Sequence, residues 1–249
     1  AELSIEAAAS VKGVPYHPGA AKYFEEKGFK VDAVKEGAGN GTASALSFGT
    51  GGESGTYYAF GGVLASFVSG KSNCKVTALT SGGSQANVED LTNGNVQLAY
   101  VQSDVMNYAY NGQRLFDSPV TGFSVVAQLY QEQVQIVTTN PDIKTVADLA
   151  GKKVSIGAAG SGVYFNAIDV LSAYDLKESD ISAVYQSFGD SAESLKDGKI
   201  DAAFIVAGAP TDLATAGSVY LVSLDDSHVQ SLLSASPYYT AATIKAGTY

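Results

Sequence analysis

LSFGTGGESGTYY, residues 46–58, is an apolar strand that runs through a turn of glycine, serine and threonine into the start of a helix. In such a strand–turn–helix unit, the free N–H groups of the first helical turn and the neighbouring hydroxyls point to one place. The positive end of the helix dipole lies behind them. The stretch is therefore predicted to form a seat for an anion.

The same pattern occurs twice more, in ALTSGGSQAN (residues 78–87) and in VSIGAAGSGVYFN (residues 154–166). Short apolar runs alternate with helical patterns along the chain, which indicates an α/β fold of mostly parallel sheets flanked by helices. In such folds ligands bind outside the carboxyl ends of the strands. We expect the three turns to converge on one small ligand. Glycine in these turns also has a purely structural explanation, because tight connections need a residue that tolerates positive φ.

Apolar periodicity predicts the elements of the chain. Near the amino terminus we expect a short helical segment, a proline-containing turn and a helix over residues 20–27 that Gly28 stops. Three later helices are predicted to begin at Thr145, at Ser161 and at Asp190. Asp148 follows Thr145 by three residues, and Glu193 follows Asp190 as its partner in a capping pair. The predicted strands are residues 46–50, 75–80, 97–102, 123–130, 133–139, 153–157, 183–187, 202–206 and 219–224.

The composition excludes several classes of protein. A chain of 249 residues, of which 45% are hydrophobic and 16% charged, is long enough for two lobes of ordinary size. Because 15 Lys and Arg oppose 25 Asp and Glu, for a net charge of −10, no nucleic-acid partner is expected. No apolar run approaches the ~20 residues of a membrane helix. The single cysteine, Cys74, allows no internal disulfide and is predicted to be buried.

Motifs for nucleotide, metal and serine chemistry are missing. Ser54 stands where the dinucleotide fingerprint needs its third glycine, and no Gly-Lys-Ser/Thr follows as in a phosphate-binding loop. His17 and His228 belong to distant segments, and no Gly-x-Ser-x-Gly elbow occurs. Two histidines and one cysteine, without metal-ligand spacing, offer no transition-metal site. We expect no cofactor and no metal.

Residues 123–139 carry two β-rich runs with no helix between them. A strand that continues directly into a second sheet is a natural crossing between lobes, so we predict a hinge near residues 130–133 with polar side chains that line a cleft. Residues 30–45 are rich in small residues and read as a linker. The predicted organisation is a helical segment (1–29) that packs on lobe 1, the linker (30–45), lobe 1 (46–130), lobe 2 (131–235) and a return toward lobe 1 (236–249).

Five blocks follow one another along the chain: GTGGESGTYYAFGG, LTSGGSQANVEDLTNGNVQLAYVQSD, VAQLYQEQVQIV, VADLAGKKVSIGAAGSG and LKDGKIDAAFIVAGAP. In type and spacing they resemble the TAXI family of solute-binding proteins from TRAP transporters, over residues 46–249. The resemblance implies a two-lobe periplasmic-binding-protein fold, type II-like, with the ligand cleft between the lobes. It also implies a periplasmic receptor without catalysis that closes on a small organic anion, glutamate or a similar acid, and delivers it to membrane permease subunits. We expect a monomer.

Two features depart from that family. GVPYHPGAAKYFEEKGF, which the family usually carries near its carboxyl end, stands here at residues 13–29. This resembles a circular permutation joined through residues 30–45. At the other end, IKAGTY is usually followed by a further strand, its connection and a helix, so part of the family's carboxyl-terminal region is expected to be missing.

The expected ligand contacts are donors at helix starts and at the hinge. An arginine clamp is not expected, because the single arginine, Arg114, follows a helix at the end away from the turns. The family's motif adds the end of one strand, Gln102 and Ser103. An enzyme that uses Glu132 as a general base is the alternative from another class. The candidate site residues are Ser54, Gly55, Thr56, Tyr57, Ser81, Gly82, Gly83, Ser84, Asn87, Gln102, Ser103, Tyr130, Glu132, Ser161 and Gly162.

Overall fold

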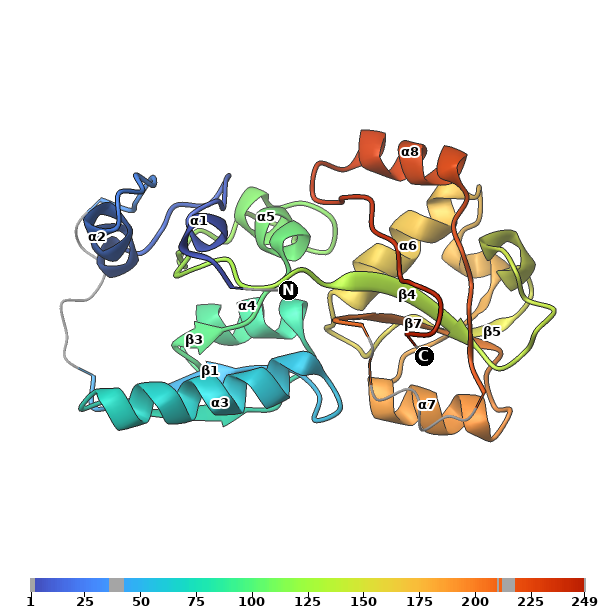
Figure 1. Cartoon of the computed structure of the whole chain (residues 1–249), viewed down its shortest axis with the longest axis horizontal. Helices are drawn as coiled ribbons and strands as arrows, with labels where there is room; N and C mark the ends of the chain where they lie inside the picture. Colours follow the sequence, from blue (N-terminus) through green and yellow to red (C-terminus); the bar gives the residue numbers. More distant parts are fainter. Residues whose placement is uncertain (1–2, 36–42, 210, 212–217, 249) are drawn as a thin grey trace.

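The computed structural model describes residues 3–35, 43–209, 211 and 218–248. Within these residues the chain forms two α/β lobes, each built around its own sheet, that lie side by side along the long axis of the molecule (Figure 1). Four of the six strand pairings are parallel and two are antiparallel. The predicted fold class, two α/β lobes with mostly parallel sheets, is confirmed.

Lobe 1 contains a three-stranded parallel sheet in the order β2-β1-β3. Phe48 and Val76 from the sheet pack with Ala65 of α3 and with Tyr100, which follows β3. The stretch 46–58 forms the predicted strand, glycine-rich turn and helix. The elements are β1 (Ala45–Gly49), α3 (Thr56–Lys71), β2 (Lys75–Leu79), α4 (Ser84–Thr92), β3 (Leu98–Ala99) and α5 (Ser103–Asn111).

Lobe 2 contains a five-stranded sheet in the order β6-β5-β7-β4-β8, in which β4 runs antiparallel to both neighbours. Every residue of β7 is buried, as a strand covered on both faces requires. Phe204 faces the cluster that includes α6, and Ile205 faces Leu195 of α7. The elements are β4 (Gln133–Thr138), η1 (Val146–Leu149), β5 (Lys153–Ser155), α6 (Val163–Ala173), η2 (Glu178–Asp180), β6 (Ser182–Val184), α7 (Phe188–Lys196), β7 (Ala202–Ala207), β8 (Tyr220–Leu221) and α8 (Asp226–Ala235).

The amino-terminal segment, with α1 (Ile5–Ala8) and α2 (Pro18–Glu26), packs beside α5. Its buried anchor is Tyr16, which is 1% exposed; the hydroxyl donates to the Ala8 carbonyl and accepts from the Val11 N–H, both at 2.9 Å. Tyr16 also forms isolated bridges with Ala33 and with Val125. Pro18 opens α2, and Gly28, at φ +88°, follows its end as predicted.

Three local predictions were wrong. Residues 123–130 form no strand; Val125 and Gln128 bond the amino-terminal segment, and the stretch borders a cavity on its way to lobe 2. Helix α7 begins one turn earlier than expected, because the Ser187 hydroxyl accepts from the Asp190 N–H. Cys74 is partly buried and not enclosed, because it precedes the edge strand β2. Within the expected linker, residues 36–42 lie outside the described residues.

Residues 121–133 lead the chain from lobe 1 into lobe 2, and the carboxyl-terminal stretch from residue 236 leaves α8 and runs along the junction of the lobes (Figure 1). We call these the two stretches at the junction. Tyr238 of the second stretch packs edge-on against Tyr108 of α5 in lobe 1. Across the described residues, no helix combines the length and the apolarity that crossing a bilayer requires.

Candidate ligand-binding site

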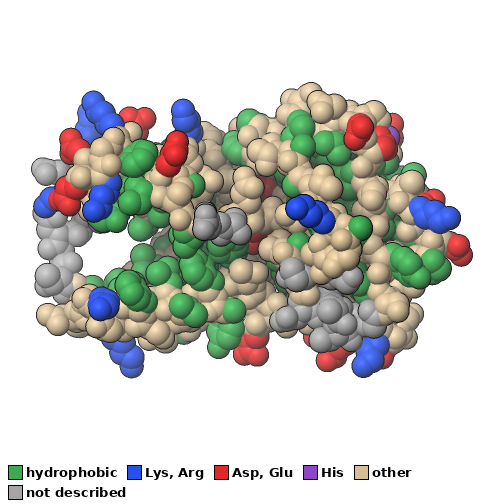
Figure 2. All heavy atoms as spheres, viewed as in Figure 1, with side chains coloured by type: hydrophobic (Ala, Val, Ile, Leu, Met, Phe, Trp, Pro, Cys, Tyr) green, Lys and Arg blue, Asp and Glu red, His purple; other side chains and the backbone are tan. Residues whose placement is uncertain are grey.

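A cavity of about 2090 Å³ runs from the space between the lobes along lobe 1. Its far part is apolar, lined by side chains such as Phe48, Leu64 and Val126, and Figure 2 shows a hollow with hydrophobic side chains on that side of the molecule. The part between the lobes is polar. We call this polar part the cleft; it is lined by Tyr57, Gln102, Ser103, Asp104, Tyr130, Glu132, Asn166 and Tyr239.

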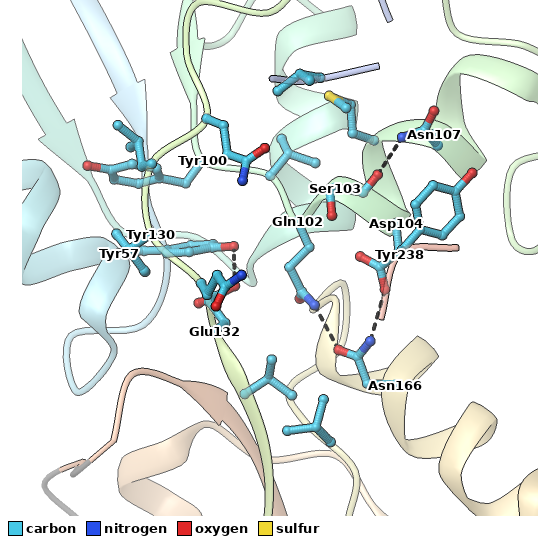
Figure 3. A pocket seen from close by; sticks show the side chains of 18 of the residues that line it. Tyr57, Tyr100, Gln102, Ser103, Asp104, Asn107, Tyr130, Glu132, Asn166 and Tyr238 are labelled. Atoms are coloured by element: carbon cyan, nitrogen blue, oxygen red, sulfur yellow. Dashed lines mark hydrogen bonds between the residues drawn. The ribbon is translucent and has the colours of Figure 1, made fainter. Parts of the chain in front are cut away.

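Glu132 lies on the connection between the lobes, one residue before β4, and is partly buried. Its Oε2 accepts a hydrogen bond of 2.9 Å from the hydroxyl of Tyr57, in the first turn of α3 (Figure 3). Burial raises the pKa of Glu132 to about 8; Asp104 adds to this effect, and the bond from Tyr57 opposes it. Burial and the neighbouring Glu132 also raise the pKa of Tyr57 well above its ordinary value.

Asn166 of lobe 2 bridges two side chains of lobe 1 in the cleft (Figure 3). Its Oδ1 accepts from Gln102 Nε2 at 2.7 Å, and its Nδ2 donates to Asp104 Oδ2 at 2.9 Å. Asp104 is 4% exposed, and this burial raises its pKa to about 6 although hydrogen bonds from Val105 and Asn166 oppose the rise. The amide of Asn166 therefore ties the start of α5 to α6.

The carboxyl-terminal stretch completes the far side of the cleft. The hydroxyl of Tyr239 accepts from Asn166 Nδ2 at 2.8 Å and donates to Asp169 Oδ2 at 2.9 Å. Asp169 in turn forms an ion pair with Arg114, which also lies over the ring of Tyr108. Arg114 does not line the cavity, so the single arginine holds lobe 1 to α6 and supplies no clamp for a ligand.

The second and third glycine turns meet each other across the two lobes. A Cβ built on Gly82 would lie 2.5 Å from the carbonyl oxygen of Ala159, and one built on Gly83 would lie 3.1 Å from Cα of Ser161. The Ala86 N–H donates to the Gly160 carbonyl at 3.0 Å. We call this approach of residues 82–86 to residues 159–162 the closing contact. Glycine is required there because only its missing Cβ lets two backbones come so close.

The first glycine turn makes a second contact with lobe 2. A Cβ on Gly189, in the first turn of α7, would lie 2.8 Å from Oγ of Ser54. A Cβ on Gly55 would reach the ring of Phe188 at 3.8 Å. All three predicted turns thus meet at the junction of the lobes, where two of them face each other directly.

The structure divides the predicted site residues into two groups. Five of them line the cavity: Tyr57, Gln102, Ser103, Tyr130 and Glu132. The other ten do not, and they belong to the turns around it: Ser54, Gly55, Thr56, Ser81, Gly82, Gly83, Ser84, Asn87, Ser161 and Gly162.

Several residues of the second group hold the turns in shape. Asn87 Nδ2 donates at 2.7 Å to the carbonyls of both Thr50 and Tyr100, which ties the ends of β1 and β3 together. The Ser84 hydroxyl accepts from the Gln102 N–H at 3.0 Å and so supports the start of α5. Ser161 Oγ is buried and has no hydrogen-bond partner in the described part of the chain.

Sequence reasoning missed three residues of the cleft, Asp104, Asn166 and Tyr239. Asp104 directly follows the predicted Ser103, and Asn166 lies one helical turn after the predicted Gly162, so their positions at helix starts are a usable signal. Nothing in the sequence around Tyr239 points to the cleft, because its position depends on the return of the chain from lobe 2.

Side-chain capping separates the helices at the cleft from the others. The Ncap side chains of α1, α2, α7 and α8 accept bonds from the first helical turn. The four helices α3, α4, α5 and α6 have no side-chain cap. Three of these, α3, α5 and α6, supply cleft residues from their first turns. N–H groups of these first turns leave hydrogen-bond donors and a positive potential at the cleft, although that of Val105 already donates to Asp104 Oδ1.

Other polar atoms of the cavity wall also lack protein partners. The hydroxyls of Tyr100 and Tyr130 and Oε1 of Gln133 are buried without a hydrogen bond in the described residues. Burial raises the pKa of Tyr100 to about 12, so its hydroxyl keeps its proton. Among the residues that the structure covers, no cluster of three His, Cys, Asp or Glu side chains could hold a metal ion.

Solved structures share this architecture. The alkanesulfonate-binding protein SsuA from Xanthomonas axonopodis pv. citri, bound to MOPS, is 19% identical with a TM-score of 0.51, and the match covers 74% of this chain and 61% of that one. A protein from Bordetella bronchiseptica RB50 is 19% identical with a TM-score of 0.54, and the match covers 72% and 56% of the two chains. The chain thus spans about 60% of the length of these structures. Residues 48–249 match the NMT1-like family, and the chain belongs to that family.

Proposed function

We propose that this protein is a periplasmic solute receptor that binds a small carboxylate between its two lobes and delivers it to the permease of a TRAP transporter. The fold of a two-lobe binding protein and the membership of the NMT1-like family support the receptor role. The resemblance of five sequence blocks to the TAXI family supports the carboxylate and the TRAP partner. A monomer suits this role, because both walls of the cleft come from one chain.

The observation that carries the proposal is the set of uncapped helix starts around the cleft. None of the helices α3, α5 and α6 has a capping side chain at its Ncap position, and all three place side chains in the cavity wall. In α5 the Val105 N–H is bonded to Asp104 Oδ1, so the donors that remain for a ligand there are those of Ser103 and Asp104. A ligand carboxylate satisfies such groups, and each charge-assisted bond is typically worth ~1.5–3 kcal/mol. These local donors would allow a protein with a net charge of −10 to bind an anion.

The alkanesulfonate-binding protein with the same fold suggests a sulfonate as a competing anion. Both groups present oxygen acceptors, and the uncapped helices alone do not discriminate between them. Two carboxyl groups in the cleft, the partly buried Glu132 and the buried Asp104, favour a ligand that can share a proton. A carboxylate does so much more readily than a sulfonate, which is a far weaker base.

An enzyme that uses Glu132 as a general base is the less favoured reading. With a pKa of about 8, the carboxyl group carries its proton at neutral pH and is a hydrogen-bond donor there. The hydroxyl of Tyr57 donates a hydrogen bond to the carboxyl group of Glu132. None of the eight cleft residues is a histidine that could act as a second acid or base.

Isothermal titration with L-glutamate, shorter and longer dicarboxylates and a short alkanesulfonate tests the proposal. We expect saturable 1:1 binding of a carboxylate and no chemical change of the ligand recovered afterwards. Preferential binding of the sulfonate would replace the carboxylate assignment. Formation of a product would establish the enzyme instead.

A further inference from the structure

Among the described residues, neither carboxyl group of the cleft, that of Glu132 or that of Asp104, forms an ion pair with a cation. Arg114, the single arginine, is committed to Asp169. Glu132 accepts its hydrogen bond from a neutral group, the hydroxyl of Tyr57.

The groups that shift the pKa of Glu132 are neutral or acidic, although Lys12 and His17 of the amino-terminal segment also line the cavity. The titratable groups that act on it are Tyr57 from α3, Tyr130 from the same connection and Asp104 from α5. Helix α6 and strand β4 contribute uncharged side chains to the cavity wall, such as Asn166. An ionised carboxylate that is buried without a cation is less stable than its protonated form. The raised pKa of Glu132, about 8, agrees with this geometry.

We propose that the cleft binds its anionic ligand together with a proton, which is carried on the carboxyl group of Glu132. This proposal rests on the proposed binding of a carboxylate. Because Oε2 accepts the bond from Tyr57, Oε1 carries the proton and donates it to an oxygen of the ligand. If Glu132 were ionised, its carboxylate and the carboxylate of the ligand would repel each other. The proton comes from the solvent.

Between pH 7 and pH 9 the pH dependence follows from Glu132, because Asp104, with a pKa of about 6, is already largely ionised there. A ligand that binds only the form with a protonated Glu132 loses affinity as the pH rises through this range. With a midpoint near pH 8, its affinity falls about tenfold between pH 7 and pH 9. At pH 8 each binding event takes up about half a proton, because half of the free protein is then ionised at this site.

Titration calorimetry of L-glutamate and the other dicarboxylates at pH 6, 7, 8 and 9, in pairs of buffers with different ionisation heats, measures affinity and proton uptake together. Glu132→Gln keeps a donor but cannot ionise. We expect it to bind less than tenfold more weakly than the natural protein at pH 7 and to lose the pH dependence. Glu178→Gln is the matched control, because Glu178 also accepts from a tyrosine hydroxyl, that of Tyr164 at 3.0 Å, but lies outside the cavity.

Thermal unfolding gives a readout that needs no ligand. A carboxyl group whose pKa is raised by folding makes the fold less stable as pH rises from its unfolded value, ~4.3, to its folded value. The melting temperature of Glu132→Gln should therefore exceed that of the natural protein by an amount that grows between pH 5 and pH 8. The Glu178→Gln control shows how much of the change comes from losing a carboxyl group that accepts from a tyrosine.

The outcomes separate the two proposals. The proton-linked binding is overturned if the affinity is equal at pH 7 and pH 9, or if the Glu132→Gln variant keeps the natural pH dependence. Neither result would contradict the proposal that the protein is a carboxylate receptor. Loss of binding in Glu132→Gln by a hundredfold or more at pH 7 also overturns the proton-linked binding, because the charge itself would then be needed. If no acid binds at any pH, both proposals fall.

Discussion

Replacing Gly82 by alanine perturbs the closing contact at one atom. The new Cβ would lie 2.5 Å from the carbonyl oxygen of Ala159, whereas real Cβ atoms essentially never come within 3.0 Å of another heavy atom. The φ angle of Gly82 is not in the positive range, so alanine fits the backbone of lobe 1 itself. The strain therefore falls on the contact between the lobes.

The magnitude follows from that distance. The two backbones must separate by at least about 0.5 Å to reach the 3.0 Å limit. This lengthens the nearby bond from the Ala86 N–H to the Gly160 carbonyl, now 3.0 Å, to the edge of hydrogen-bonding range. Overpacking of this kind typically costs ~1–3 kcal/mol. If the ligand is bound by the closed arrangement, its affinity falls roughly 5- to 150-fold.

Two measurements check this prediction. Titration calorimetry with the acid that binds best gives the loss of affinity, and amide hydrogen exchange gives the protection of the Ala86 N–H without any ligand. We expect weaker binding and faster exchange at Ala86. Gly52→Ala is the matched control, because a Cβ there meets nothing within 4 Å, although Gly52 belongs to a glycine turn of the same lobe. If Gly82→Ala binds and exchanges like Gly52→Ala, the closing contact has no functional role.

Three further perturbations test the rest of the cleft. Arg114→Ala should lower thermal stability, because Asp169 loses its ion pair while only 11% of its side chain is exposed; calorimetry should show at most a modest change in ligand affinity, and complete loss of binding would mean that Arg114 contacts the ligand. Asp104→Asn should raise the melting temperature relative to the natural protein at pH 7 but not at pH 4. The reason is that a carboxyl group with a pKa raised to about 6 makes the fold less stable as the pH rises from ~4 to 6. An equal change in melting temperature at both pH values would contradict the burial of a charge. Asn166→Ala should increase the radius of gyration in solution scattering, because it removes the bridge from α6 to Gln102 and Asp104; an unchanged radius would show that the bridge does not hold the lobes together.

Local sequence patterns predicted most of the fold because local contacts determine it. The stretch 46–58 becomes β1, a turn and α3 through its own apolar and glycine positions. The box between Thr145 and Asp148 forms both of its expected bonds, since its two partners lie three residues apart. The crossing between the lobes was expected near residues 130–133, and the chain does enter β4 of lobe 2 at Gln133. That these residues act as a hinge stays a prediction.

What the sequence could not provide depends on contacts between distant segments. Residues 123–130 have the composition of a strand, yet they form only one isolated bridge, at Val125, and one further backbone bond to the amino-terminal segment, at Gln128, while they border the cavity. Asn166 gains its role from Gln102 and Asp104, more than 60 residues earlier. Tyr239 enters the cleft only because the chain returns from lobe 2.

The glycine turns illustrate how one sequence signal carries two functions. Gly82, Gly83 and Gly160 were expected as part of an anion seat, and the structure gives them the closing contact between the lobes. The helices that follow these turns have no side-chain cap, and the Ala86 N–H, in the first turn of α4, donates to the Gly160 carbonyl across the contact. A side chain that capped either helix would need space in the closing contact, where a single Cβ already clashes. Close approach of the lobes and uncapped helix starts therefore have one cause, the absence of side chains at these positions.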